Sequence, residues 1–168
     1  KVKEKAIDAQ LMSEKLRSIM AHLHDDHITN EGVDYGKLKL DPKFRKYVML
    51  TTLLQTVDLD ELIDNDKMRK AFFINVYNAM TVHANVVLGP PRNFLERRRF
   101  FQKVCYIIGG MKYALDDIEH GILRANGGKK KARFKENDKR LKYSFMQLDP
   151  RIHFALVCGA KSCPAVQI

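Results

Sequence analysis

The sequence contains few cysteines. Its 168 residues include three, at Cys105, Cys158 and Cys163. Three thiols are too few for a disulfide scaffold, and an odd number indicates free thiols in a reducing compartment or a thiol enzyme. We therefore expect a cytoplasmic protein.

Long apolar runs are also missing. The longest apolar stretch, from Ala71 to Leu88, is interrupted by four polar side chains, Asn75, Asn78, His83 and Asn85. Because a lipid-spanning helix needs about 20 mostly apolar residues in succession, we expect no membrane span. The chain starts at Lys1 without an apolar signal segment, which favours one domain, residues 1–168, excised from a longer multidomain protein.

Positive charge is concentrated in two segments. The chain has 30 basic and 20 acidic residues, a net charge of +10. Residues 92–103 carry +4 and residues 129–142 carry +6, so the rest of the chain is neutral. The second segment has a single aromatic residue, Phe134, which argues against nucleic-acid binding by base stacking. We expect instead an acidic partner, bound through the basic runs Arg97, Arg98, Arg99 and Lys129, Lys130, Lys131.

Apolar periodicity predicts a helical first part, residues 1–101, and a mixed second part, residues 102–168. The first part is expected to contain helices at residues 7–23, 42–57, 66–88 and 93–101, with residues 33–40 as an irregular or extended link. The second part is expected to contain a hairpin at residues 102–115, a helix at residues 116–124 and a buried strand at residues 152–157. This pattern predicts an α+β fold, mainly helical with a small antiparallel sheet.

A stripe of amides marks one face of the expected helix at residues 66–88. Asn75, Asn78 and Asn85 fall within about 80° of one another at about 100° per residue. Because amides in an apolar helix need hydrogen-bond partners, we expect them to fix neighbouring loop backbone. The alternative is contact with a substrate, for which Asn75 is the candidate. His83 lies on the apolar side and is expected to be a core histidine.

Glu119 and His120 are adjacent in the expected helix at residues 116–124. Neighbouring helix positions point about 100° apart, so these two side chains cannot face each other. An imidazole titrates near neutral pH, which suits a general base. We expect His120 to be this base, with Glu119 in support. The alternative is a surface acid beside a packed histidine.

The last segment, RIHFALVCGAKSCP, contains two of the three thiols. In a regular strand His153 points away from Cys158, so no direct bond between them is expected. Gly159 and Ala160 leave room for a sharp turn, which places Cys163 in a loop beyond the strand, a common place for a nucleophile. Cys158 is the second candidate. The alternatives are thiols buried as small apolar groups or a redox disulfide between Cys158 and Cys163.

The run HLHDDH, residues 22–27, contains three histidines and two aspartates, which are residue types that can bind a metal ion. Adjacent and alternate helix positions point in different directions, whereas zinc needs ligands that converge on a tetrahedron. We expect a solvated helix end here, and we expect neither a metal nor a cofactor.

Three segments, in order, resemble the signature segments of the family called domain of unknown function 547: AFFINVYNAMTVHA, VCYIIGGMKYALDDIEHGILR and LDPRIHFALVCGAKSCP. The first helix, VDYGKL and DPKFRKYV also resemble the form of this domain that follows glutaredoxin and DEP domains. Phe73 stands where the family often has a tryptophan. The chain stops at Ile168, where the family continues into a further strand and helix.

The resemblance implies an α+β domain that has been likened to papain-like or transglutaminase-like cysteine enzymes. The positions that match the family's motifs are Asn75, Tyr77, Asn78, Glu119, His120, Arg124, Asp149, Arg151, His153, Cys158, Ser162 and Cys163.

The leading hypothesis is a cysteine hydrolase or acyl-transferase acting on an amide or thioester of a protein or peptide. Cys163 or Cys158 is its nucleophile, a histidine, preferably His120, exchanges the proton, and Glu119 or an asparagine orients the ring. The first alternative is a non-catalytic module that binds an acidic partner or an anionic surface. The second is a redox module that works with an attached glutaredoxin.

Overall fold

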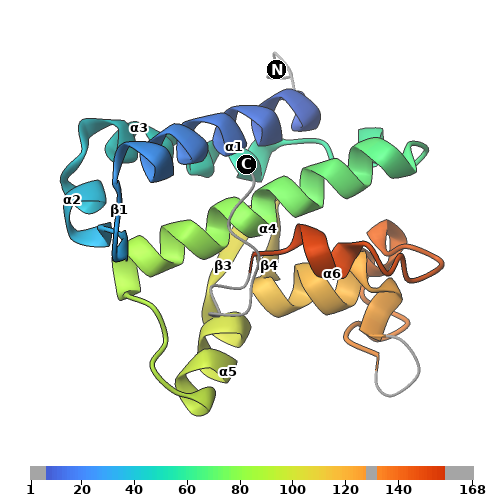
Figure 1. Ribbon diagram of the computed structural model, residues 1–168. Coiled ribbons are helices and arrows are strands. Elements are labelled where there is room, and N and C mark those ends of the chain that lie inside the picture. Colours follow the sequence, from blue (N-terminus) through green and yellow to red (C-terminus); the bar gives the residue numbers. More distant parts are fainter. Residues whose placement is uncertain (1–6, 128–131, 158–168) are drawn as a thin grey trace.

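The structure is a computed structural model that describes residues 7–127 and 132–157. Its fold is α+β, mainly helical with two small antiparallel sheets, and this confirms the expected class. Helix α4 (Asp66–Leu88) runs through the middle of the molecule. In the view of Figure 1, α1 (Ala9–Asp26) and α3 (Pro42–Thr52) lie above α4, and α5 (Phe94–Lys103) and the helix η3 (Asp117–Leu123) lie below it.

The helices begin at capping residues that can be identified in the sequence. Asp41 accepts a hydrogen bond from Lys43 N at 2.7 Å and precedes Pro42 at the start of α3. Asn65 accepts from Met68 N at 3.1 Å at the start of α4. These side chains satisfy backbone donors that the first helical turn leaves free, so the predicted helix starts are confirmed.

Helix α4 supplies the largest share of the core. Its buried side chains include Phe72, Phe73, Val76, Tyr77 and Met80. Within the described residues α4 is also the one helix long and apolar enough to cross a membrane, and 61% of its most apolar window is buried inside the protein. The helix ends at Gly89, whose φ of 79° is readily adopted by glycine, and two prolines follow.

The predicted hairpin is confirmed. Strands β3 (Cys105–Ile108) and β4 (Met111–Ala114) pair antiparallel, with Cys105 opposite Ala114 and Ile108 opposite Met111. Gly109 and Gly110 form the two-residue turn with φ of 54° and 74°, which matches the twist of the paired strands. A second, shorter sheet joins β1 (Ile28–Thr29) to β2 (Gly32–Val33).

Short helical turns connect these elements. They are η1 (Leu53–Thr56), η2 (Asp60–Leu62), η4 (Ala125–Gly127) and η5 (Lys139–Tyr143). Residues 33–40, expected to be an irregular or extended link, contain helix α2 (Tyr35–Leu40). The Asp34 side chain accepts from Lys37 N at 3.0 Å, and Leu38 is fully buried. A capping residue and one buried anchor are enough to stabilise this short helix against the core.

The prediction of a strand at residues 152–157 is wrong. Ile152–Ala155 form the single-turn helix α6. Ile152 and Leu156 are buried, while His153 and Phe154 between them are exposed. Buried side chains four residues apart match the period of a helix rather than the alternation of a strand. The side-chain directions inferred from a strand therefore do not apply to His153.

Candidate functional site

Three segments that are far apart in the sequence meet at Tyr77 and Asn78, two neighbouring residues of α4. The Tyr77 hydroxyl donates to Glu119 Oε2 of η3 over 2.9 Å. The Asn78 amide donates to the Ala155 carbonyl oxygen at 2.9 Å and accepts from Val157 N at 2.9 Å. The structure therefore brings α4, η3 and the segment that begins with α6 together at one junction, formed by Tyr77 and Asn78.

The Asn78 contacts decide between the two hypotheses for the amide stripe at this position. One side chain satisfies both a backbone acceptor and a backbone donor on either side of Leu156. The expectation that these amides fix loop backbone is therefore confirmed for Asn78. Asn75 lies apart from this contact, and its amide reaches Ser13 Oγ of α1 at 3.5 Å.

Both oxygens of the Glu119 carboxylate have partners. Oε2 accepts from Tyr77, and Oε1 accepts from Arg124 Nε at 3.0 Å. Burial, together with the neighbouring Glu119 charge, raises the pKa of Tyr77 far above its ordinary value, so its hydroxyl stays protonated and donates. Glu119 is thus held by two donors, one on each carboxylate oxygen.

His120 faces solvent, one residue after the partly buried Glu119. Asp116 lies four residues earlier in the chain, and the His120 charge is one of several that act on its carboxyl group. Burial raises the pKa of Asp116, while the positive charges of Arg133 and His120 lower it in part. The sequence analysis predicts a helix that begins at Asp116 and assigns this residue no further role. The four-residue spacing between Asp116 and His120, about one helical turn, was the sequence signal that could have indicated this charge interaction.

The helix η3 is a π-helix, a wider form than the α-helix expected from the sequence. The Arg124 amide donates to the Glu119 carbonyl oxygen at 2.9 Å, five residues back along the chain. Turns of this kind are rare and occur frequently at functional sites. The Phe134 ring fills the space where a side chain at Gly121 would lie. This packing brings the residue 134 loop directly against the helix that carries Glu119 and His120.

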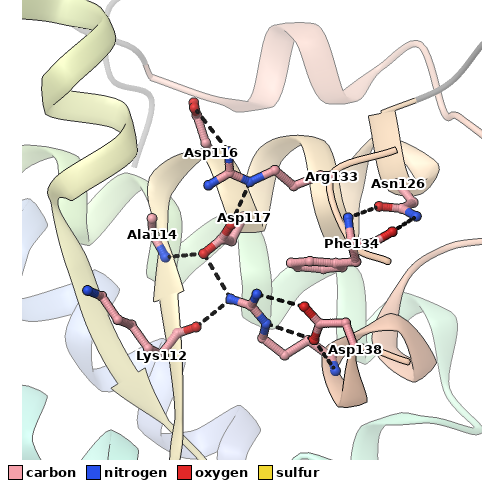
Figure 2. Close-up of polar contacts among 9 residues, drawn as sticks. Lys112, Ala114, Asp116, Asp117, Asn126, Arg133, Phe134 and Asp138 are labelled. Atoms are coloured by element: carbon pink, nitrogen blue, oxygen red, sulfur yellow. Dashed lines mark hydrogen bonds and ion pairs between the residues drawn. The ribbon is translucent and has the colours of Figure 1, made fainter. Parts of the chain in front are cut away.

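A network around Asp117 holds η3 in place, as Figure 2 shows. The Asp117 carboxylate accepts from Ala114 N at 2.9 Å, from Arg133 Nε at 2.6 Å and from Arg140 Nη1 at 2.9 Å. Arg140 also forms a two-point ion pair with Asp138. Its guanidinium lies 4.4 Å from the centroid of the Phe134 ring. The network connects β4, η3, η5 and the residue 133 loop.

These contacts neutralise part of the basic segment at residues 129–142. Arg133 and Arg140 pair with Asp117, and Lys142 Nζ pairs with Asp60. Of the five basic side chains of this segment that the structure describes, three are therefore paired with acidic side chains of the same chain. The expected docking residues Lys129, Lys130 and Lys131 lie outside the described residues.

The structure shows where one further histidine and one of the three cysteines lie. His153 lies exposed on α6, with its ring 5.5 Å from that of Phe154. Cys105 is a free, half-buried thiol in β3. The two expected nucleophiles, Cys158 and Cys163, lie outside the described residues, and Val157 is the last residue before them.

His83 is the core histidine that the sequence predicts. Its Nδ1 lies 2.6 Å from the Tyr106 hydroxyl oxygen, within hydrogen-bond distance, and its ring packs edge-on against Phe44 and Tyr47, with centroids 5.4 Å apart in both cases. Burial lowers the pKa of His83 to about 4. A half-buried imidazole that packs against three aromatic rings in this way serves packing rather than proton transfer to a substrate.

The HLHDDH run forms local contacts. His22 Nδ1 and His27 Nδ1 lie 2.6 and 2.8 Å from the carbonyl oxygens of Ser18 and Leu23, one helical turn back. Within residues 7–127 and 132–157, no group of three or more potential metal-binding side chains converges.

Comparison with known protein families gives one match. The fold and the junction at Tyr77 and Asn78 define a small α+β domain organised around a central helix. The chain belongs to the family described as "Protein of unknown function, DUF547", whose model matches residues 62–168. That range begins just before α4 and includes all three segments that meet at the junction. The comparisons with curated proteins and with solved structures gave no match.

Proposed function

We propose that this domain is a cysteine hydrolase or acyl-transferase. In this proposal a thiolate of Cys163 or Cys158 attacks an amide or thioester carbonyl and forms a C–S bond. The His120 imidazolium returns the proton to the departing amine or thiol, and water or a second nucleophile then releases the acyl group. The observation that supports it is the junction at Tyr77 and Asn78. Asn78 fixes the chain at Val157, immediately before the first candidate thiol, and Tyr77 binds the helix that carries His120.

The surroundings of His120 suit a proton-transfer role. The ring is exposed, so a substrate can reach it, and Asp116 precedes it by four residues, about one helical turn. Asp116 is then the orienting group, and Glu119 is a positioning residue that acts through Tyr77.

Thiol labelling tests this proposal. We expect one of Cys158 and Cys163 to react with iodoacetamide well below pH 7, because an imidazolium partner lowers a thiol pKa from about 8.5. Cys105 provides an internal comparison in the same molecule. The rate of each thiol is measured by mass spectrometry of peptides across about pH 5 to 9. His120→Gln should move the midpoint of the reactive thiol upward by at least about one pH unit.

His153→Gln is the matched control, since it removes an exposed imidazole from α6 rather than from η3. It should leave the labelling profile unchanged. If all three thiols react slowly with midpoints near pH 8.5, the proposal is wrong. A shift caused by His153→Gln and not by His120→Gln would assign the base to α6 instead.

The proposed setting is a reducing cytoplasm in which the domain works beside fused glutaredoxin and DEP domains. A protein or peptide is the substrate class in this proposal. The redox hypothesis predicts a reversible bond between Cys158 and Cys163, and a mass difference of about 2 Da on reduction would reveal it.

A further inference from the structure

Helix α5 and the segment leading to it form a surface that the proposed activity does not use. Figure 1 shows α5 projecting below the body of the molecule. At its first turn, Phe94 and Leu95 expose 76% and 66% of their surface. Exposed large apolar side chains that lie next to each other indicate an interaction surface more strongly than isolated ones.

Basic side chains follow these apolar residues at helical spacing. Arg98 lies four residues after Phe94, and Arg99 lies four residues after Leu95, so each arginine shares a face with one apolar side chain. Arg98 and Arg99 are exposed and form no ion pair with any part of the chain that the structure describes. The one acidic residue of α5, Glu96, accepts instead from Arg92 N and from the Asn93 amide.

A groove extends this surface toward the end of α4. Its volume is about 680 Å³, and its lining combines apolar groups such as Leu88 and Phe100 with Arg99 and Lys103. Leu88 itself is 67% exposed. The surface therefore presents apolar side chains at its tip, and immediately behind them the exposed cations Arg98 and Arg99, which form no ion pair within residues 7–127 and 132–157.

We propose that the α5 surface, defined by Leu88, Phe94, Leu95, Arg98, Arg99 and Lys103, docks the domain on an anionic lipid bilayer. Phe94 and Leu95 enter the boundary between headgroups and acyl chains, and the arginines bind lipid phosphates. Amphipathic surface helices bind in this way, through buried apolar area together with attraction to anionic lipid. The charge of residues 92–103, five basic side chains against one acidic, complements such a membrane.

This arrangement favours a bilayer over an acidic soluble macromolecule. An acidic protein or a nucleic acid would be held by the cations, and it would gain little from an aliphatic side chain on a projecting tip. A bilayer uses both parts of the surface at once, because the guanidinium stems extend back toward the headgroups while the tip is inserted.

The absence of tryptophan from the chain permits a direct test. Phe94→Trp introduces a single tryptophan at the tip. Phe154→Trp introduces one on α6, at a phenylalanine that is 75% exposed compared with 76% for Phe94. With vesicles of phosphatidylcholine and about 30% phosphatidylserine, the emission of the residue 94 tryptophan should shift to shorter wavelength and be quenched by brominated acyl chains. The emission of the residue 154 tryptophan should not change.

Vesicle sedimentation measures the two contributions separately. Arg98→Gln with Arg99→Gln should weaken binding to the anionic vesicles about 30-fold, which corresponds to two membrane-proximal charges. Phe94→Ser with Leu95→Ser should weaken it about tenfold or more. The controls are Lys135→Gln with Lys139→Gln, which remove two exposed charges from the other basic segment, and Met146→Ser, which removes an exposed apolar side chain. Each control should change binding less than about twofold.

Three results would overturn the proposal. The first is no binding to anionic vesicles at about 50 mM salt, where electrostatic attraction is strong. The second is equal emission shifts at residues 94 and 154. The third is binding that falls with the arginine pair and not with the serine pair, because the surface would then act by charge alone and fit an acidic protein or nucleic acid.

Discussion

Tyr77 of α4 and Glu119 of η3 are joined by a hydrogen bond of 2.9 Å across 42 residues of sequence. The bond connects the central helix to the π-helix that carries His120. Because Arg124 takes the other carboxylate oxygen at 3.0 Å, the Glu119 charge is compensated within the fold. The strength of this link can be measured.

Tyr77→Phe should lower the free energy of unfolding by about 1.5 to 3 kcal/mol, because it removes a donor from a carboxylate that is only 17% exposed. Urea unfolding followed by circular dichroism gives the value. Tyr143→Phe is the matched control, since its hydroxyl donates to Asp60, whose side chain is 56% exposed. The control should lose less than about 1 kcal/mol. Equal losses would show that burial of the acceptor is unimportant here.

Asn78→Leu should release the chain at Val157. The variant keeps a side chain of similar size but removes both the acceptor for Val157 N and the donor to Ala155 O. We expect hydrogen exchange of the Val157 amide to accelerate by about tenfold or more, because a backbone group that loses its partner becomes open to solvent. Nuclear magnetic resonance exchange measurements read this amide directly.

The control for that experiment is Asn75→Leu, which removes a contact of 3.5 Å with Ser13 at a different position on the same helix. Val157 exchange should be unchanged in this variant. Unchanged exchange in Asn78→Leu would mean that the segment is held by Ile152 and Leu156 packing alone.

His83 should make stability depend on pH. Burial lowers its pKa in the folded protein to about 4, whereas an unfolded chain has a histidine pKa of about 6.5. The unfolded state therefore binds more protons between these values, and stability should fall as pH drops from about 6.5 toward about 4. Below pH 4 this contribution stops changing. The total effect should be at most about 3 kcal/mol.

Urea unfolding at a series of pH values checks this expectation. Substitution of His83 by Asn should reduce the slope of stability against pH in that window, whatever its effect on the absolute stability. A wild-type protein and a His83→Asn variant with parallel pH profiles would contradict the assignment.

Gly121→Ala should destabilise the domain by about 1 to 3 kcal/mol, although alanine is the better helix former. The physical reason is the Phe134 ring, which occupies the position of the missing side chain. The test is a double-mutant cycle in which Gly121→Ala is combined with Phe134→Leu. In the leucine background the alanine should cost less than about 0.5 kcal/mol. An equal cost in both backgrounds would rule out the ring contact as the cause.

Most helices and the β3–β4 hairpin could be predicted because their signals are local. Asp41 followed by Pro42, Asn65 and the Gly109–Gly110 turn each act within a few residues of their own position. The apolar content of α4 likewise identifies it as a core helix. The candidate histidine and its helix were also found this way, since the sequence places His120 on a helix at residues 116–124.

The secondary structure of residues 152–157 could not be predicted from local sequence signals. A short apolar run is equally compatible with a buried strand and with a buried helical turn. A strand also needs a neighbouring strand for its backbone groups, and among the described residues the sheets are β1–β2 and β3–β4. Without such a neighbour, the backbone here is satisfied within the turn of α6 and by the Asn78 side chain.

The sequence by itself determined the α+β class, the family, the positions of the main helices and the two concentrations of positive charge. Only the tertiary structure decided that Glu119 binds Tyr77 and Arg124, that Asp117 binds Arg133 and Arg140, and that residues 152–155 are helical. The reason is physical. The first set follows from interactions within a few residues, whereas Tyr77 and Asn78 find their partners 42 and 79 residues away, at distances that exist only after the core has packed.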